Sequence, residues 1–205
     1  MSKHRCAQFG AAFALIGALF APAALAGAQM YEPLSASVQS AMSRSISDRA
    51  HIQLAFANPQ DGYRWLVTMS KRLEKRIPDA EYREDLLKTV HYEASRAGLD
   101  PQLVLGLIQV ESGFKKYAVS KAGARGLMQV MPFWAELLGD QSHNLFHLRT
   151  NLRYGCTILR HYLDIEKGNL FRALGRYNGS LGRAEYPNLV IGARHKLFQY
   201  DGKLI

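Results

Sequence analysis

The pattern of apolar and polar positions along the chain predicts a series of amphipathic helices after residue 62. Apolar residues recur there with helical spacing, and no segment shows the strict alternation of a half-buried strand. Pro78 and Gly98 end two of these periodic segments, as is typical of helix ends. We therefore expect an all-α single domain over residues 63–205. The predicted helices cover 63–77, 80–97, 101–112, 126–138, 149–166, 169–175 and 187–199.

Residues 1–26 have the pattern of a secretory signal peptide. Lys3 and Arg5 precede an apolar run rich in small residues, and the run ends in Ala-Leu-Ala, the small-x-small spacing of a cleavage site. A membrane anchor is the alternative, but the run is short for a bilayer span and Pro22 interrupts it. We expect cleavage after residue 26, with Ala28 as the second choice, and a periplasmic mature protein.

Residues 27–62 are rich in Ser, Ala and Gln, and their periodicity is weak. We expect a flexible or loosely helical N-terminal leader there.

The chain of 205 residues carries a formal charge of +9 and stays basic after loss of residues 1–26. This charge would favour binding to an anionic polymer, but it would equally keep the protein soluble, so charge alone does not choose between the two. Of the two cysteines, only Cys156 would survive cleavage, so no intramolecular disulfide is expected. Its apolar helical face predicts a buried, inert thiol.

One carboxylate, Glu111, stands at the end of an apolar helix. Asp100 followed by a proline predicts the start of that helix. Residues three, four and seven positions before Glu111 share its face, and they are Ile108, Leu107 and Val104. The polar face would instead hold Gln102, Gly106 and Gln109. Burial and the negative end of the helix dipole both favour the protonated carboxyl, which could donate a proton.

A purely structural role is the alternative for Glu111: it could satisfy a neighbouring backbone group or pair with an arginine. The downstream sequence favours a groove. A basic, glycine-bearing loop follows, then a segment in which Gln129 and Met131 could offer a polar and an apolar contact to a ligand. Tyr177 and Asn178 are expected in a loop after a short helix, where a hydroxyl and an amide would suit a sugar.

Three ordered segments resemble the family 1 lytic transglycosylases, the catalytic domain of the soluble lytic transglycosylases, which is related in fold to goose-type lysozyme. The segments are ES at 111–112, AVSKAGARGLMQVMP at 118–132 and YNGS at 177–180. The resemblance extends from about Tyr82 to about Val190 and depends on all three motifs in order. It implies a lysozyme-like helical domain with a groove for peptidoglycan glycan strands.

The resemblance also implies roles for single residues. Glu111 would be the catalytic acid and base. The substrate-binding positions would be Ser120, Gln129, Met131, Tyr177 and Asn178. The last two match the family's Tyr-Asn pair, which helps to position the carboxyl and the N-acetyl group. The family usually has Ala-Tyr-Asn-Ala-Gly there, whereas this chain has Arg-Tyr-Asn-Gly-Ser.

The implied reaction cleaves the bond between MurNAc and GlcNAc with a single carboxyl group. Glu111 would protonate the glycosidic oxygen, and the acetamido oxygen of MurNAc would hold C1 as an oxazolinium. Glu111 would then take the proton of the C6 hydroxyl, which closes onto C1 to give 1,6-anhydro-MurNAc. No metal, cofactor or nucleic acid is expected. Cell-wall or secretion assemblies could be further partners, and the sequence does not choose between them.

Two other functions stay open on the sequence alone. A goose-type hydrolase would use the same acid with water as the acceptor, and a non-catalytic peptidoglycan-binding module would need no such acid. A second carboxylate for a conventional glycosidase could come from Asp140 or Asp164, although nothing in the sequence places them near Glu111. His143 and His147 have a possible ligand spacing but no apparent third ligand, which favours surface or capping roles.

Overall fold

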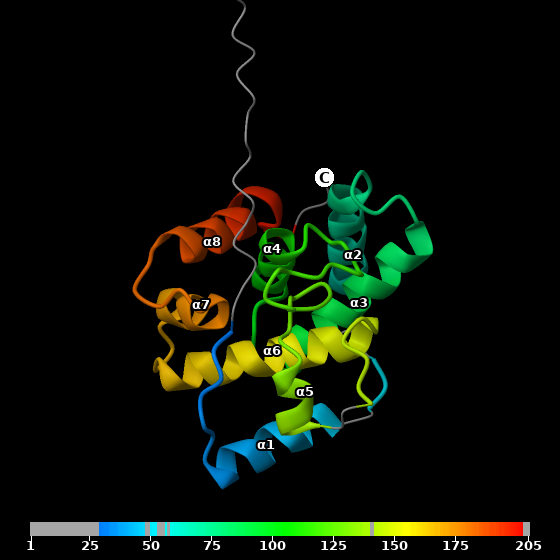
Figure 1. Ribbon diagram of the computed structural model, residues 1–205. Helices are drawn as coiled ribbons and strands as arrows, with labels where there is room; N and C mark the ends of the chain where they lie inside the picture. Colours follow the sequence, from blue (N-terminus) through cyan, green and yellow to red (C-terminus); the bar gives the residue numbers. More distant parts are fainter. Residues whose placement is uncertain (1–28, 48–49, 53–55, 57, 140–141, 203–205) are drawn as a thin grey trace, which may run out of the picture.

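The computed structural model describes residues 29–47, 50–52, 56, 58–139 and 142–202, and the predicted signal peptide lies outside these residues. Helices make up the described fold, and the described residues contain two isolated β-bridges but no strand (Figure 1). The all-α prediction is therefore confirmed. The helices are α1 (Ala36–Ser47), α2 (Pro59–Leu73), α3 (Ala80–Arg96), α4 (Pro101–Glu111), α5 (Phe133–Leu138), α6 (Leu148–Ile165), α7 (Leu170–Asn178) and α8 (Glu185–Leu197).

Local sequence signals explain where several helices begin. The side chains of Asp79 and Asp100 accept hydrogen bonds from backbone N–H groups in the first turns of α3 and α4, as predicted. Asn58 caps α2 in the same way and is followed by a proline, so this helix begins four residues earlier than expected. Asn169 caps α7.

Helix α4 occupies the centre of the fold. It packs along α8 and against α3, and in Figure 1 it lies between α8 and α2, above the long helix α6. The prediction that Gly106 marks a polar face was wrong. A Cβ at this position would lie 2.9 Å from the backbone nitrogen of Arg194 and 3.0 Å from the carbonyl oxygen of Val190. The missing side chain thus lets the backbones of α4 and α8 approach closely.

The predicted helix over 126–138 is also corrected, because only α5, from Phe133, is helical. The preceding residues form a turn in which Arg125 makes bridges to both Val119 and Val130. Gly126 and Gln129 have positive φ angles of 76° and 50°, which a right-handed helix does not allow.

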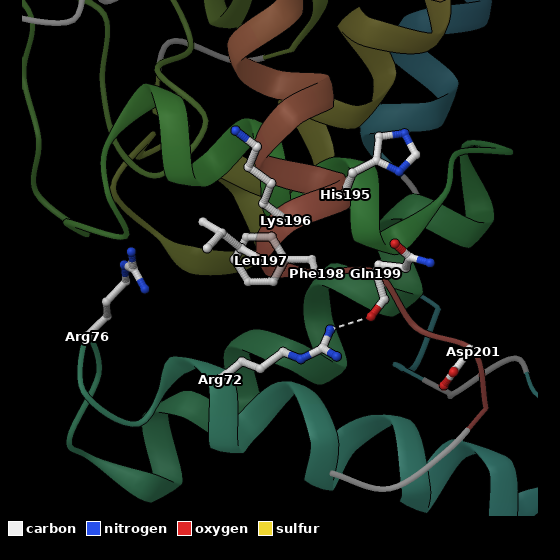
Figure 2. A pocket seen from close by; sticks show the side chains of 8 residues that line it. All are labelled: Arg72, Arg76, His195, Lys196, Leu197, Phe198, Gln199 and Asp201. Atoms are coloured by element: carbon white, nitrogen blue, oxygen red, sulfur yellow. Dashed lines mark hydrogen bonds between the residues drawn. The ribbon is translucent and has the colours of Figure 1, made fainter.

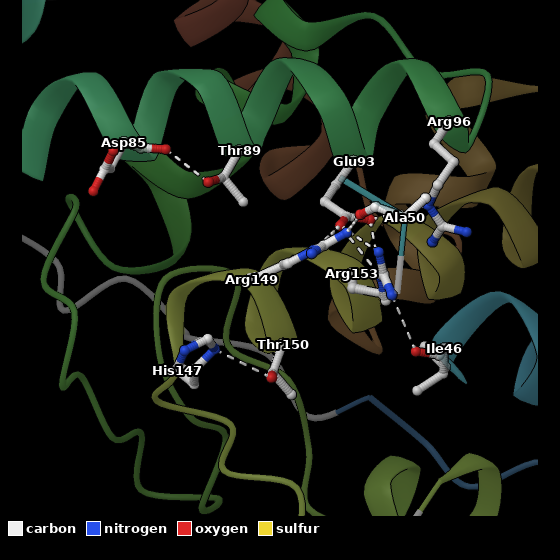
Figure 3. Close-up of polar contacts among 10 residues, drawn as sticks. All are labelled: Ile46, Ala50, Asp85, Thr89, Glu93, Arg96, His147, Arg149, Thr150 and Arg153. Atoms are coloured by element: carbon white, nitrogen blue, oxygen red, sulfur yellow. Dashed lines mark hydrogen bonds and ion pairs between the residues drawn. The ribbon is translucent and has the colours of Figure 1, made fainter. Parts of the chain in front are cut away.

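Helix α1 lies within the segment predicted as the leader, and it packs on α5 and α6 with Met42 and Ile46 buried. A buried ion cluster adjoins its C-terminal end (Figure 3). Glu93 of α3 pairs with Arg96 and with two arginines of α6, Arg149 and Arg153. Burying a carboxylate is tolerable only with such partners. Arg153 also donates to the carbonyl of Ile46, which ties α1 to this cluster.

Two further observations concern the cysteine of α6 and the length and hydropathy of the helices. Cys156 is fully buried in α6, as predicted, and burial raises the pKa of its thiol. Across the part of the chain that the structure describes, no helix is both long and apolar enough to cross a membrane.

Candidate active site

Glu111 is the last residue of α4, and its side chain is 6% exposed. Val104, Leu107 and Ile108, which share its face, are fully buried, as the helical spacing predicted. The hydroxyl of Tyr186, in the first turn of α8, donates a hydrogen bond of 2.5 Å to Oε1 of Glu111. The close packing of α4 on α8 places these two side chains together. The carboxyl is thus held in one orientation at the end of its helix.

Tyr186 was missed by the sequence reasoning. It is buried, and burial together with the negative charge of Glu111 raises the pKa of its hydroxyl well above the usual value. The phenol therefore keeps its proton and remains a hydrogen-bond donor. Its sequence context, Glu-Tyr-Pro at a helix start, carries no catalytic signature that could have identified it.

A loop spanning residues 125–131 lies beside Glu111 and is held in place by polar side chains from other elements. Ser112 donates to the carbonyl of Leu127 at 2.8 Å, which ties the loop to the end of α4. Asn151 of α6 accepts from the backbone nitrogen of Met128 and donates to the carbonyl of Arg125. These contacts replace the hydrogen bonds that a helix would have supplied.

The loop uses Gln129 differently from the expected contact of a side chain with a ligand. The Gln129 amide donates to the carbonyls of Gly126 and Ala118 at 2.8 and 3.2 Å, so it closes the loop from inside. Its own carbonyl oxygen accepts from the side chain of Gln29. Met131 is half-buried against the core, and its backbone nitrogen donates to the same glutamine. At Gln129 and Met131, the loop therefore makes its contacts with Gln29 through backbone groups, the carbonyl of Gln129 and the N–H of Met131.

Ser120 lies in a separate turn. Its hydroxyl and carbonyl oxygens accept from the backbone nitrogens of Ala124 and Gly123, and its nitrogen donates to Ala124. The residue therefore shapes the loop before Gly126. No contact in the described structure links its side chain to Glu111.

Tyr177 and Asn178 form the last turn of α7, so the prediction of a loop at these residues was wrong. The chain leaves the helix one residue later, at Gly179, which adopts the left-handed conformation with φ of 74°. Both side chains are buried, and the Tyr177 hydroxyl donates to the carbonyl of Met128 at 2.8 Å. Burial, and then the charge of Glu111, raise the pKa of this hydroxyl well above its usual value.

The structure therefore brings Glu111, Tyr177, Gln129 and Met131 into one neighbourhood and adds Tyr186 to it. Contacts between residues far apart in sequence create this neighbourhood. Gln29, from the predicted leader, also reaches it.

The remaining candidate acids and histidines have other partners. Asp164 pairs with Arg160 on the exposed side of α6, and Asp140 lies outside the described residues. His143 contacts the Tyr154 hydroxyl at 2.7 Å, and His147 stands at the N-cap position of α6 without a capping hydrogen bond from its side chain. The described residues contain no group of three or more His, Cys, Asp or Glu side chains that could hold a metal ion.

Two cavities lie away from Glu111. The larger, about 510 Å³, is found near the C-terminal end of α8 (Figure 2). Tyr186 is near the start of that helix. It is lined by Arg72, Arg76, His195, Lys196, Leu197, Phe198, Gln199 and Asp201. The smaller, about 140 Å³, adjoins His143, His147 and the buried ion cluster.

The helical domain with a buried carboxyl at the end of α4 is the arrangement that the three motifs led us to expect. A family model described as Transglycosylase SLT domain matches residues 88–188, and this part of the chain belongs to that family. The match includes Glu111, the loop at 125–131 and Tyr186.

Named relatives agree with the family. A transglycosylase of Enterobacteria phage PRD1 is 35% identical over 118 residues, which cover 58% of this chain and 41% of the phage protein. A membrane-bound lytic murein transglycosylase C of Actinobacillus pleuropneumoniae is 54% identical over 46 residues, or 22% of this chain and 13% of the relative. The chain thus spans less than half the length of either relative.

Solved structures of similar proteins include an inactive mutant of the lytic transglycosylase Slt from Pseudomonas aeruginosa. The similarity has a TM-score of 0.43 and 18% identity, and it covers 84% of this chain and 36% of the other. The 70-kDa soluble lytic transglycosylase of Escherichia coli gives a TM-score of 0.41 and 18% identity, with coverage of 76% and 27%.

Proposed function

We propose that this protein is a peptidoglycan lytic transglycosylase that cleaves the MurNAc-β-1,4-GlcNAc bond and forms 1,6-anhydro-MurNAc. The observation that carries the proposal is the buried carboxyl of Glu111, oriented by Tyr186 within a transglycosylase SLT domain. An acid in this environment can serve as a general acid and, after losing its proton, as a general base.

The reaction would proceed in two steps at one carboxyl group. In the first step, Glu111 gives its proton to the glycosidic oxygen, the C1–O bond breaks, and the acetamido oxygen of MurNAc bonds to C1. In the second, the Glu111 carboxylate takes the proton of the C6 hydroxyl as that oxygen bonds to C1, and the acetamido group is released. Tyr186 donates to Oε1 throughout, so the orientation of the carboxyl is the same for both proton transfers.

Among the described residues, one carboxylate influences the two tyrosines of the site. Burial and then the charge of Glu111 raise the pKa values of Tyr177 and Tyr186. A conventional glycosidase has a second carboxylate across the scissile bond. An acetamido group supplied by the substrate would take the place of that second group.

Residues 1–26 would act as a cleaved signal peptide and deliver the protein to the periplasm, where its substrate is found. The pattern of basic and apolar residues supports this location. N-terminal sequencing of the exported protein tests it, since a chain that retains Met1 in the inner membrane would contradict the proposed export.

The activity is tested by mass spectrometry of the muropeptides released from purified sacculi. A transglycosylase releases products with an anhydro end, whereas a hydrolase releases products heavier by one water. Glu111→Gln retains the shape of the side chain but cannot exchange a proton. We expect at least a roughly 10³-fold loss of product, because one residue performs both proton transfers.

Glu136→Gln is the matched control, since this exposed glutamate of α5 lies outside the site. It should release product at the rate of the wild type. Hydrated ends would favour a goose-type hydrolase. Sacculus binding without any release by the wild type would favour a non-catalytic binding module.

A further inference from the structure

The segment at residues 29–34 places one buried side chain beside the candidate active site. Gln29 is only 4% exposed, whereas its neighbours Met30 and Tyr31 are 65% and 59% exposed. A structural strand of the core would bury more than one side chain. The segment therefore resembles a bound peptide in which Gln29 is the fully inserted group and Leu34 packs more loosely on the core.

The buried carboxamide of Gln29 contacts both sides of the site. Its Oε1 accepts from the backbone nitrogen of Met131 at 3.2 Å, and its Nε2 donates to the carbonyl of Gln129 at 3.4 Å. Its side chain also lies near the Tyr177 hydroxyl, where it lowers the pKa of that group against the larger, opposing effect of burial. It thus connects the loop at 125–131 with α7, close to Glu111.

In these contacts the carbonyl oxygen and an N–H of one side-chain amide, that of Gln29, meet the backbone N–H of Met131 and the backbone carbonyl of Gln129. The acetamido group of an N-acetyl sugar also has a carbonyl oxygen, which could accept from the backbone nitrogen of Met131 in place of Oε1 of Gln29. The backbone at Gln129 and Met131 is rigid, because the Gln129 side chain and Asn151 hold the loop. A preformed site of this kind can accept either amide, but not both at once.

Contacts outside the site hold the segment in place. Glu32 pairs with Arg176 of α7 at 2.9 Å. The ring of Tyr31 lies edge-on to Phe133, with 5.8 Å between the ring centroids, and Leu34 packs against the core. Exposed ion pairs and edge contacts are individually weak, so each of them adds little to the free energy that holds the segment in place.

We propose that residues 29–34 are a self-ligand of the loop at 125–131 beside Glu111, and that a glycan strand must displace Gln29 before its N-acetyl group can bind there. The inference rests on the proposed function and adds a competitor encoded in the same chain. The apparent dissociation constant for a glycan then equals the intrinsic constant divided by the fraction of molecules whose site is open. Turnover at saturating glycan should not change.

Binding of a β-1,4-linked N-acetylglucosamine tetramer, measured by calorimetry, tests the competition without turnover. All proteins carry Glu111→Gln, so that the ligand is not cleaved. Adding Gln29→Ala removes the competing amide and should tighten binding about three- to tenfold. The control Met30→Ala, at the exposed neighbour, should leave affinity unchanged.

Glu32→Gln offers a second variant that leaves Gln29 itself intact. It weakens only the ion pair with Arg176, so binding should tighten in the same direction, by about two- to threefold. In addition, the backbone amide of Met131 should exchange its hydrogen faster in Gln29→Ala than in the parent protein, because its hydrogen-bond acceptor is gone.

Equal or weaker tetramer binding in Gln29→Ala would overturn the inference alone, because Gln29 would then support the loop rather than compete with the glycan for it. Unchanged exchange at Met131 would also overturn it. A protein that binds the tetramer in none of these variants, and releases no muropeptides as the wild type, would contradict both the inference and the proposed function.

Discussion

The hydroxyl of Tyr186 donates to Oε1 of Glu111 at 2.5 Å, although 75 residues separate the two along the chain. Glu111 is the last residue of α4, and Tyr186 is the second residue of α8. The contact depends on the close packing of these helices, which Gly106 permits. The geometry of the proposed acid is therefore a property of the helix pair rather than of the local sequence around Glu111.

Tyr186→Phe should lower kcat and kcat/KM together. The ring and its packing remain, but Glu111 loses the donor that orients it for both proton transfers. A lost hydrogen bond to a charged group costs about 1.5–3 kcal/mol, or roughly ten- to a hundredfold in rate. Turnover of a soluble glycan oligomer measures the effect. Tyr117→Phe, at an exposed tyrosine, is the control, and equal rates for both variants would remove Tyr186 from the mechanism.

Tyr177→Phe should reduce stability as well as rate. The Tyr177 hydroxyl donates to the carbonyl of Met128 from a fully buried position, and a phenylalanine leaves that carbonyl without its partner. The expected cost is about 1–3 kcal/mol of unfolding free energy. Urea denaturation measures this loss, and turnover should fall because the loop beside Glu111 loses a support. A variant that is fully stable yet slow would assign the hydroxyl to the transition state alone.

The sequence predicted the parts of the site that depend on nearby residues. Asp100 and the proline after it start α4, and the helical spacing places Glu111 on the face of buried Leu107 and Ile108. These features follow from capping and periodicity, which act within a few residues. The family motifs added Tyr177, which the structure places beside the loop at 125–131.

The parts that escaped prediction depend on distant contacts. The loop at 125–131 has apolar residues at helical spacing, yet Asn151 and Ser112 hold it in another conformation. Tyr186 meets Glu111 only because α8 packs on α4, and the burial of Gly106 has the same cause. No local pattern contains the relative placement of two helices, so such residues could not be found from periodicity.

Gly155→Ala should destabilise the protein and slow it. A Cβ on this residue of α6 would lie 2.4 Å from Sδ and 2.8 Å from Cβ of Met128, whose backbone is bonded to both Asn151 and Tyr177. Overpacking of this kind costs about 1–3 kcal/mol. The measurement is the urea midpoint beside turnover of the glycan oligomer.

The matched control for that change is Gly192→Ala in α8, where a Cβ added to the glycine would have no neighbouring atom within 4 Å. Alanine is the better helix former, so this variant should gain about 0.5–1 kcal/mol. If both glycine variants shift stability in the same direction, the contact with Met128 is not what makes Gly155 sensitive.

His91 should make stability fall as the pH is lowered from about 7 to 4. Its ring is stacked on Phe56, with 4.3 Å between centroids, and lies edge-on to Trp65. Burial lowers the pKa of His91 from 6.5 to about 4. The unfolded chain therefore binds a proton that the folded chain excludes, so the stabilising contribution is complete above pH 6.5 and is lost on acidification toward 4. The loss should be about 1–3 kcal/mol.

His91→Leu keeps an apolar group there without a titrating ring. Urea midpoints measured from pH 7 to 4 for both proteins separate the contribution of His91 to stability from that of the carboxylates. The wild-type curve should fall more steeply than that of the variant, and parallel curves would show that His91 is protonated as easily in the fold as in the unfolded chain.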